Sequence, residues 1–286
     1  MEKISVVTGA TSGMGYYTAK IAGEKTTVLI TGRSQRKVDQ TLAELREAGV
    51  KCEGMVCDVT DRAQVKALAE KANEMGKIVA VYSVAGLSPS NGYDGADIMK
   101  ANAFSVVYTN EEFSKYMTNG CFLNVSSSTA YMMPEDRLPK QVFDLALTDI
   151  PAFEAAMMKM TEAAGMAYAI SKSFVKYYTR ESAFYRGRGQ GNRVCSVAPG
   201  VIDTKMTQNE QSDRAKESSL SFSALQRIGT PEELAYSFVA LADERNSFVN
   251  GIDLLVDGGC FCAGWNGMNF RGQEQTVSAE EMAMKK

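Results

Sequence analysis

The chain of 286 residues is long for one average domain but normal for a single α/β unit. Its formal charge of −3 and pI near 5.3 argue against nucleic acid or an anionic membrane as the main partner. No run approaches the ~20 apolar residues of a membrane-spanning helix. The start "MEKISVVTGA" lacks the basic region and apolar core of a signal peptide. We therefore expect a cytoplasmic protein with neither a nucleic-acid nor a membrane partner.

The chain contains six cysteines and no histidine, and both facts restrict its chemistry. The cysteines are scattered, which is typical of reduced thiols in a cytosolic protein. Cys260 and Cys262 are separated by one residue, which is poor spacing for zinc, so we predict no metal site. Without histidine, any proton transfer must use tyrosine, lysine, a carboxylate or a bound water, which excludes Ser-His-Asp and Cys-His catalysis.

Short apolar runs alternate with helical stretches along the chain. The first strand is predicted at 3–8, before a glycine-rich turn and a helix from about 13 to 23. A second strand at 26–31 precedes a polar helix from about 35 to 48. Further strands are expected within 51–59, 77–86, 120–128, 192–200 and 251–259. This alternation predicts a single doubly wound α/β domain with a mostly parallel sheet that helices cover on both faces.

The turn "TGATSGMG" (8–15) lies between the first strand and the first helix. Its three glycines permit a tight turn, the close approach of a phosphate, and packing of the helix on the sheet. The exposed N–H groups and the helix dipole attract a pyrophosphate. The placement predicts a dinucleotide site, and the alternative is a helix start that uses glycine only to turn. The residues expected at the cofactor here are Gly9, Thr11, Ser12, Gly13, Met14 and Gly15.

The end of the second strand indicates which dinucleotide binds. A carboxylate about 20 residues after the glycine turn would hold the ribose hydroxyls of NAD, whereas an arginine suits the 2′-phosphate of NADP. The sequence there is "ITGRSQRK" (30–37), which has no acid and places Arg33 and Ser34 after the strand. We predict NADP(H) in preference to NAD(H), with these two residues in the site. The alternative is that Arg33 is an ordinary exposed residue at a helix start.

A tyrosine and a lysine stand four residues apart in "GMAYAISKS" (165–173), within a predicted helix. Positions i and i+4 share one helical face, so the phenol of Tyr168 and the ammonium of Lys172 can meet. Taken alone, the pair is consistent with an ordinary surface contact, because Tyr-x-x-x-Lys arises by chance in many helices. The rest of the sequence has to distinguish this from a tyrosine whose proton is easily removed.

A set of motifs between about residue 3 and 262 occurs in the order and rough spacing of the short-chain dehydrogenase/reductase family, which the chain resembles. These motifs are "TGATSGMG", "CDV" (57–59), "SVAG" (83–86), Asn102 in "MKANAFS", "NVSSS" (124–128), "YAISK" (168–172) and "APGVIDT" (198–204). The resemblance implies an NAD(P)-dependent oxidoreductase in which the cofactor carries the hydride. It also implies that Tyr168 and Lys172 form a catalytic pair.

The resemblance implies a role for each matching position. Tyr168 would exchange a proton with the substrate oxygen, and Ser127 would hydrogen-bond the same oxygen. Lys172 would lower the pKa of the tyrosine from its free value of about 10 and hold the nicotinamide ribose. Asn102 would hold a proton-relay water. Further cofactor contacts are implied for Asp58 and Val59 at the adenine, Ala85 and Gly86 along the cofactor, and Ile202 and Thr204 at the carboxamide and phosphates.

Two features depart from the family pattern. Asn-Asn-Ala-Gly usually follows the fourth strand, whereas this chain has Ser83-Val84-Ala85-Gly86, which loses side chains that tie neighbouring strands. Ser127 and Tyr168 are 41 residues apart, where about a dozen is usual in the family. We place the extra segment at 129–164 and predict that it forms one or two short helices just before the catalytic helix.

The insertion and the "APG" and "GTPEELA" stretches resemble the bacterial 3α-hydroxysteroid dehydrogenase/carbonyl reductase branch. This resemblance implies an apolar alcohol or ketone substrate, such as a 3-hydroxysteroid or bile acid, or an aromatic alcohol as the alternative. Methionines in the insertion and Met206 would either form an adaptable wall for such a substrate or fill a core or an interface. A catalytically inactive dinucleotide-sensing protein is the alternative of another class, and the filled catalytic positions argue against it.

The expected organisation is a Rossmann domain at 1–262 and a C-terminal tail at 263–286. The resemblance implies a homo-oligomer, a dimer or a tetramer. Its contacts would use the helix that carries Tyr168, or the last strand (252–257) with the helix before it. The tail contains the only tryptophan, Trp265, which is costly to leave in water, so we expect the start of the tail to pack on a pocket rim or a neighbouring subunit.

Overall fold

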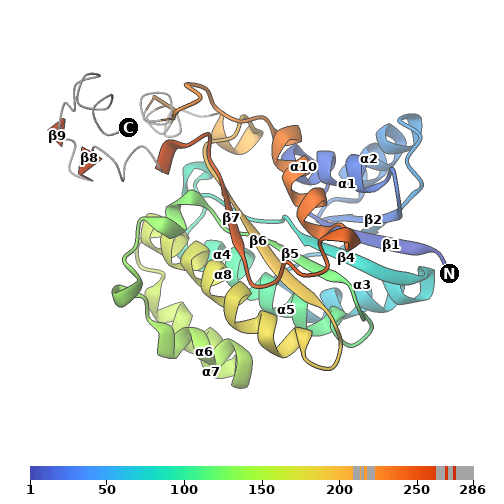
Figure 1. The fold of residues 1–286 in the computed structure, drawn as a ribbon, viewed down its shortest axis with the longest axis horizontal. Helices are drawn as coiled ribbons and strands as arrows, with labels where there is room; N and C mark the ends of the chain where they lie inside the picture. Colours follow the sequence, from blue (N-terminus) through green and yellow to red (C-terminus); the bar gives the residue numbers. More distant parts are fainter. Residues whose placement is uncertain (209–212, 214–215, 218–222, 262–267, 270–272, 275–286) are drawn as a thin grey trace.

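The computed structural model describes residues 1–208, 213, 216–217, 223–261, 268–269 and 273–274. Its body is a seven-stranded parallel sheet in the order β3-β2-β1-β4-β5-β6-β7, which confirms the predicted doubly wound fold (Figure 1). The strands are β1 (Lys3–Thr8), β2 (Thr27–Gly32), β3 (Cys52–Val56), β4 (Lys77–Ser83), β5 (Cys121–Val125), β6 (Arg193–Pro199) and β7 (Asp253–Val256). A separate antiparallel pair joins β8 (Met268–Asn269) to β9 (Gln273–Glu274).

Helices cover both faces of the sheet because successive residues of each buried strand point to opposite sides. In β1, Ile4 and Val6 belong to one buried cluster and Val7 to the other. One face carries α1 (Gly13–Ala22), α2 (Gln35–Glu47) and α10 (Pro231–Ala242) (Figure 1). The other face carries α3 (Arg62–Met75), α4 (Gly95–Met99), α5 (Ser105–Phe113) and α8 (Ala164–Gly187). None of the described helices combines the length and hydrophobicity that crossing a bilayer requires.

The order of the strands places a crevice at the carboxyl ends of the strands. The chain runs from β1 outward to β2 and β3 and then returns to β4, which pairs with the other side of β1. The loops that leave the carboxyl ends of β1 and β4 therefore diverge. In doubly wound sheets, ligands bind at such a reversal of strand order. Both the glycine turn and the Ser83–Gly86 loop start at this point.

The predicted insertion contains two α-helices, α6 (Lys140–Thr148) and α7 (Ile150–Met157), which pack against α8. The rings of Phe143 and Phe153 lie 5.3 and 4.7 Å from the ring of Phe174 in α8, centroid to centroid. The Tyr177 hydroxyl of α8 donates a hydrogen bond to Asp144 at 2.6 Å. The insertion therefore covers a face of the helix that carries Tyr168, on the side away from the sheet.

Arg193, the first residue of β6, ties that strand to the carboxyl end of α10. Its side chain is buried, with 7% of its surface exposed. The last carbonyls of a helix have no partner within the helix and need an outside donor. The guanidinium supplies it by donating to the carbonyls of Leu241, Ala242, Asp243 and Val249 at 2.9–3.1 Å.

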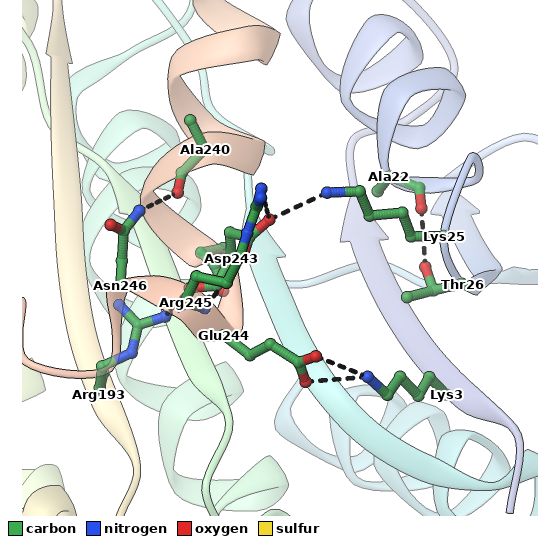
Figure 2. A network of polar contacts seen from close by, with 11 residues as sticks. Lys3, Ala22, Lys25, Thr26, Arg193, Ala240, Asp243, Glu244, Arg245 and Asn246 are labelled. Carbon is green, nitrogen blue, oxygen red and sulfur yellow. Dashed lines mark hydrogen bonds and ion pairs between the residues drawn. The ribbon is translucent and has the colours of Figure 1, made fainter.

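Ion pairs extend this contact toward β1 and α1, as Figure 2 shows. Asp243 accepts hydrogen bonds from Lys25 at 3.0 Å and from Arg245 at 2.9 Å. Glu244 pairs with Lys3 at 2.9 Å. The cationic partner of each pair is well exposed, so each pair contributes less to stability than the buried guanidinium. The network lies at the amino ends of the strands, whereas the crevice lies at their carboxyl ends.

We predict that Arg193→Met lowers the free energy of unfolding by about 3 kcal/mol, because several buried carbonyls lose their donor and each buried acceptor left unsatisfied costs about 1–3 kcal/mol. Urea unfolding followed by circular dichroism measures the effect. Arg245→Met is the matched control, because its exposed pair with Asp243 belongs to the same network. Equal shifts of the urea midpoint in the two variants would contradict the structural role of Arg193.

Candidate active site

A cavity of about 590 Å³ lies at the carboxyl ends of β1, β2 and β4. Its lining contains most of the residues predicted to bind the cofactor, namely Gly9, Thr11, Ser12, Gly13, Met14, Gly15, Arg33, Ser34, Asp58, Val59, Ala85, Gly86 and Thr204. An adjoining cavity of about 260 Å³ is lined by Ser127, Tyr168, Lys172 and Ile202. The two cavities share Met14, Gly86 and Thr204 among their lining residues, so they form one continuous cleft.

The glycine turn has a shape that side chains would block. Gly9 adopts φ +68°, and a Cβ atom there would lie 2.8 Å from the Cα of Ala85. A Cβ atom on Gly15 would lie 2.3 Å from the carbonyl oxygen of Gly9. Ser12, the N-cap of α1, makes no side-chain hydrogen bond to the helix, so the first N–H groups of α1 stay available to a ligand. The turn therefore fits the phosphates of a dinucleotide.

Positive charge gathers where the second strand ends. Arg33 and Ser34 line the cavity as predicted, and Lys37 of α2 lines it as well. Asp58 also lines it, and its carboxylate accepts hydrogen bonds from the N–H and hydroxyl of Thr60 at 2.9 and 2.8 Å. The cations in this lining that sequence reasoning did not select are Lys37, Lys100 and Lys205. For Lys37 a signal existed, because it lies four residues after Arg33 in the basic run at the start of α2.

Asn102 lies in a π-helical turn (Lys100–Phe104) between α4 and α5, and it is almost fully buried. Its Oδ1 accepts from the N–H of Leu87 at 2.8 Å, and its Nδ2 donates to the carbonyl of Leu87 at 3.0 Å and to the Ser171 hydroxyl at 3.3 Å. The side chain therefore ties the loop after β4 to α8. The relay-water role stays a prediction, whereas this positioning of the loop is visible directly.

Lys172 is buried beneath the cleft, with 7% of its surface exposed. Its ammonium donates to the carbonyl of Val125, the last residue of β5, at 2.8 Å and lies 5.9 Å from the centre of the Tyr168 ring. A Cβ atom on Gly86 would come within 3.7 Å of the same ammonium, so the loop after β4 passes close to it. Burial lowers the pKa of Lys172 to about 8, and the Asp253 carboxylate opposes this effect. The side chain remains mainly cationic at neutral pH.

Tyr168 and Ser127 line the same end of the cleft. Burial raises the pKa of Tyr168, and the neighbouring Ser127 hydroxyl lowers it. Ser127 caps a short turn by accepting a hydrogen bond from the N–H of Thr129 at 3.2 Å. The Ser126 hydroxyl instead donates to Asp253 at 2.6 Å. The Ser126 hydroxyl is thereby engaged with a carboxylate, and the role of Ser127 at a substrate oxygen stays a prediction.

The methionines of the insertion do not line the cleft. They therefore do not form the adaptable wall for an apolar substrate that was one of the two interpretations of the sequence. Met157 is fully buried, and Met133, Met158 and Met160 pack against the same core cluster. Met132 is 54% exposed. Of the methionines considered for the wall, Met206 is the one that lines the cleft within the described chain. The expected packing of Trp265 falls on residues outside those that the structure describes.

Comparison with known proteins matches two sequence profiles to successive parts of the chain. Residues 3–138 match "short chain dehydrogenase" and residues 152–260 match "Enoyl-(Acyl carrier protein) reductase". A 3-oxoacyl-(acyl-carrier-protein) reductase of Thermotoga maritima is 30% identical over 269 residues, covering 90% of this chain and 97% of that protein. A cis-4-hydroxycyclohexanecarboxylate dehydrogenase of Sinomonas cyclohexanicum is 28% identical, covering 90% and 96%.

Solved structures share the fold. A mutant short-chain dehydrogenase/reductase of Serratia marcescens has a TM-score of 0.71 at 23% identity and covers 90% of this chain and 97% of its own. An actinorhodin polyketide ketoreductase variant determined with NADPH has a TM-score of 0.70 at 24% identity, with coverage of 91% and 97%. The order of the strands and the position of the cleft are consistent with the family that these matches indicate. The chain belongs to the short-chain dehydrogenase/reductase family of oxidoreductases.

Proposed function

We propose that the protein is an NADP(H)-dependent oxidoreductase that interconverts a secondary alcohol and a ketone. The observation that supports this most is the continuous cleft, which joins the glycine turn to Ser127, Tyr168 and Lys172. Members of this family use NAD(P), and the residues lining the cleft fit such a dinucleotide. When bound, the nicotinamide supplies or accepts the hydride. The protein contributes binding, orientation and the transfer of the proton.

The proton passes through Tyr168 in this proposal. Its hydroxyl donates to the carbonyl oxygen during reduction and withdraws the proton during oxidation. The Ser127 hydroxyl donates a hydrogen bond to the same oxygen. Lys172 holds a positive charge beside the phenol, which lowers the cost of forming the tyrosinate. Because burial raises the pKa of Tyr168, the phenol stays protonated at neutral pH, in the form that reduction needs.

The positive lining beside β2 supports the preference for NADP(H). Arg33 and Lys37 flank Ser34, and no carboxylate occupies the position that would bind the ribose hydroxyls of NAD. A guanidinium and an ammonium together suit a phosphate carrying close to two negative charges. Asp58 stands further along the same wall, with its carboxylate already bonded to Thr60. The cofactor preference therefore rests on two cations rather than on one.

For the substrate we propose an apolar cyclic alcohol or ketone, with 3-hydroxysteroids and bile acids as the first compounds to test. The sequence resemblance supports this choice, and the name of the Sinomonas relative includes a ring alcohol. The insertion does not support it, because none of its methionines lines the cleft. Aromatic carbonyl compounds are the alternative, and a 3-oxoacyl group is the substrate in the name of the Thermotoga relative. Reduction of any of these compounds would exclude the alternative of a catalytically inactive dinucleotide-sensing protein.

We also propose that the protein forms a homo-oligomer through the free edge of the sheet. In the described sheet β7 is an edge strand, and Ile252 and Leu254 are 40% and 37% exposed there. Tyr236 of α10 and Phe248 are exposed apolar residues as well. Unpaired strand edges and clustered apolar side chains are typical of contact surfaces. A cytoplasmic location and the lack of nucleic-acid or membrane partners stay predictions from the acidic composition.

We predict that Tyr168→Phe keeps NADPH binding but lowers turnover by roughly 10²–10⁴-fold, because the acid–base group is gone. Lys172→Ala should reduce both turnover and cofactor affinity. Steady-state rates and fluorescence titration with NADPH measure the two effects separately. Tyr177→Phe on the same helix is a control outside the cleft. A folded Tyr168→Phe variant that keeps a tenth of wild-type turnover would contradict the assignment.

We predict that Arg33→Ala and Lys37→Ala each narrow the preference for NADPH over NADH by roughly ten- to a hundredfold, since each removes a charge-assisted hydrogen bond to the 2′-phosphate. The ratio of kcat/KM for the two cofactors is the measurement. Arg36→Ala is the matched control, because Arg36 is exposed and does not line the cavity. Equal kcat/KM values of the wild type with NADPH and NADH would contradict the proposed preference.

We predict that Leu254→Glu shifts the protein toward smaller assemblies, because an unpaired charge would be buried at the contact between copies. Sedimentation velocity gives the distribution of species. Phe184→Glu, at an exposed apolar residue of α8, tests the alternative contact through the helix that carries Tyr168. A monomeric wild type, or an oligomer that Leu254→Glu leaves intact, would refute this contact.

A further inference from the structure

A second cavity, of about 550 Å³, lies at the amino ends of the strands, on the face of the sheet that carries α1 and α10. Its lining includes residues of β1, β4 and β6, the carboxyl ends of α1 and α10, and the turns that follow these two helices. It shares no lining residue with either cavity of the cleft. Any ligand held here would therefore bind apart from the proposed cofactor and substrate.

Cationic side chains outnumber acidic ones around this cavity. The cations are Lys3, Lys25, Lys77, Arg193 and Arg245, and the acids are Asp243 and Glu244. Both carboxylates already pair with cations of this set, as Figure 2 shows. Lys77 is exposed and forms no ion pair within the described chain. The cavity thus carries positive charge that the protein itself does not neutralise, which favours an anionic ligand.

Tyr82 of β4 adds a buried hydrogen-bond donor to the wall. Only 3% of its surface is exposed, yet it lines the cavity. Its hydroxyl makes no hydrogen bond to any described residue. Burial raises the pKa of this phenol, so the hydroxyl keeps its proton and can donate. A buried hydroxyl without a partner is unfavourable, and an acceptor inside the cavity would supply the missing hydrogen bond.

Apolar groups form another part of the wall. They are Ala22, Val79, Ala80, Val239 and Ala242. A small-molecule site typically combines such apolar surface with a few polar groups at fixed places, in a volume of about 300–1,000 Å³. The volume and the mixed lining of this cavity therefore suit a ligand that has a compact apolar body as well as a charge.

We propose that this cavity binds a small organic anion, with a carboxylate or phosphate group on a compact apolar body. The anionic group accepts a hydrogen bond from Tyr82 and is attracted by Lys77 and the neighbouring cations. The apolar body packs against Val79 and Val239. The four exposed apolar residues proposed for the contact between copies are not among the lining residues, so that contact leaves the wall as described. The alternative is a water-filled recess whose charges serve only the ion pairs.

Isothermal titration calorimetry with four probes tests this recognition. Benzoate and phenyl phosphate distinguish the two anionic groups, benzyl alcohol has the ring without the charge, and inorganic phosphate has the charge without the ring. We expect benzoate or phenyl phosphate to bind at least about tenfold more tightly than benzyl alcohol, because a hydrogen bond to a charged group is the stronger one. Equal binding of benzyl alcohol, or no binding of either aromatic anion at millimolar concentration, would overturn the proposal.

Variants of the wall test the assignment residue by residue. Tyr82→Phe should weaken binding of the tighter anion by roughly ten- to a hundredfold, since a hydrogen bond to a charged group is lost. Lys77→Glu should weaken it by roughly five- to tenfold, because the charge is exposed and partly screened. Lys159→Glu is the matched control, since Lys159 is exposed and lines none of the three cavities. Affinities that Tyr82→Phe and Lys77→Glu leave unchanged would refute the site.

Methyl NMR of the wild type locates the bound anion without any variant of the cavity. The methyl resonances of Val79 and Val239 should shift as benzoate or phenyl phosphate is added, because both side chains line this cavity. Val84 lines the cleft and reports binding there. Shifts confined to Val84 would place the anion in the cleft and overturn the proposal. This inference does not rest on the proposed function, because no residue of the cleft takes part in it.

Discussion

The buried ammonium of Lys172 is the constraint on which the arrangement of the site depends. A charge removed from water is unfavourable unless the protein supplies partners. The carbonyl of Val125 supplies one directly, and Asp253 supplies negative charge from the next strand but one. These requirements fix the end of β5 against α8. They thereby fix Ser127 and Tyr168, which β5 and α8 carry into the same cleft.

The loop after β4 meets the same ammonium from the other side. Gly86 leaves space for it, and Asn102 holds the neighbouring Leu87 through both its backbone N–H and its carbonyl. The family pattern has asparagines in this loop, and here Ser83 and Val84 take their places. The contact from Asn102 shows how the loop is still anchored without them. Loop, strand and helix therefore converge on one buried cation.

The two ends of the parallel strands are stabilised in different ways. At the carboxyl ends of the strands, the loops diverge around a cleft. Glycines stand at positions where a larger side chain would fill this cleft. At the amino ends of the strands, Arg193 and ion pairs link the end of α10 to β6, to β1 and to the turn after α1 (Figure 2). Within the insertion, α6 and α7 pack on α8 through aromatic rings. The insertion also meets the cleft by other routes, because Thr129 lines it and Phe153 packs on Phe104 of the π-helical turn that contains Asn102.

Sequence alone determined the strand–helix alternation, the glycine turn, the Tyr168–Lys172 face and the presence of helices in the insertion. Each depends on spacing within a few residues, which local backbone geometry translates directly into structure. Tertiary structure decided that Lys37 joins Arg33 in the cleft, that Met157 enters the core, and that Asp253 reaches Ser126 from 127 positions along the chain. Burial and long-range contact arise only when separate elements pack. Neither composition nor spacing specifies which side chain will face which.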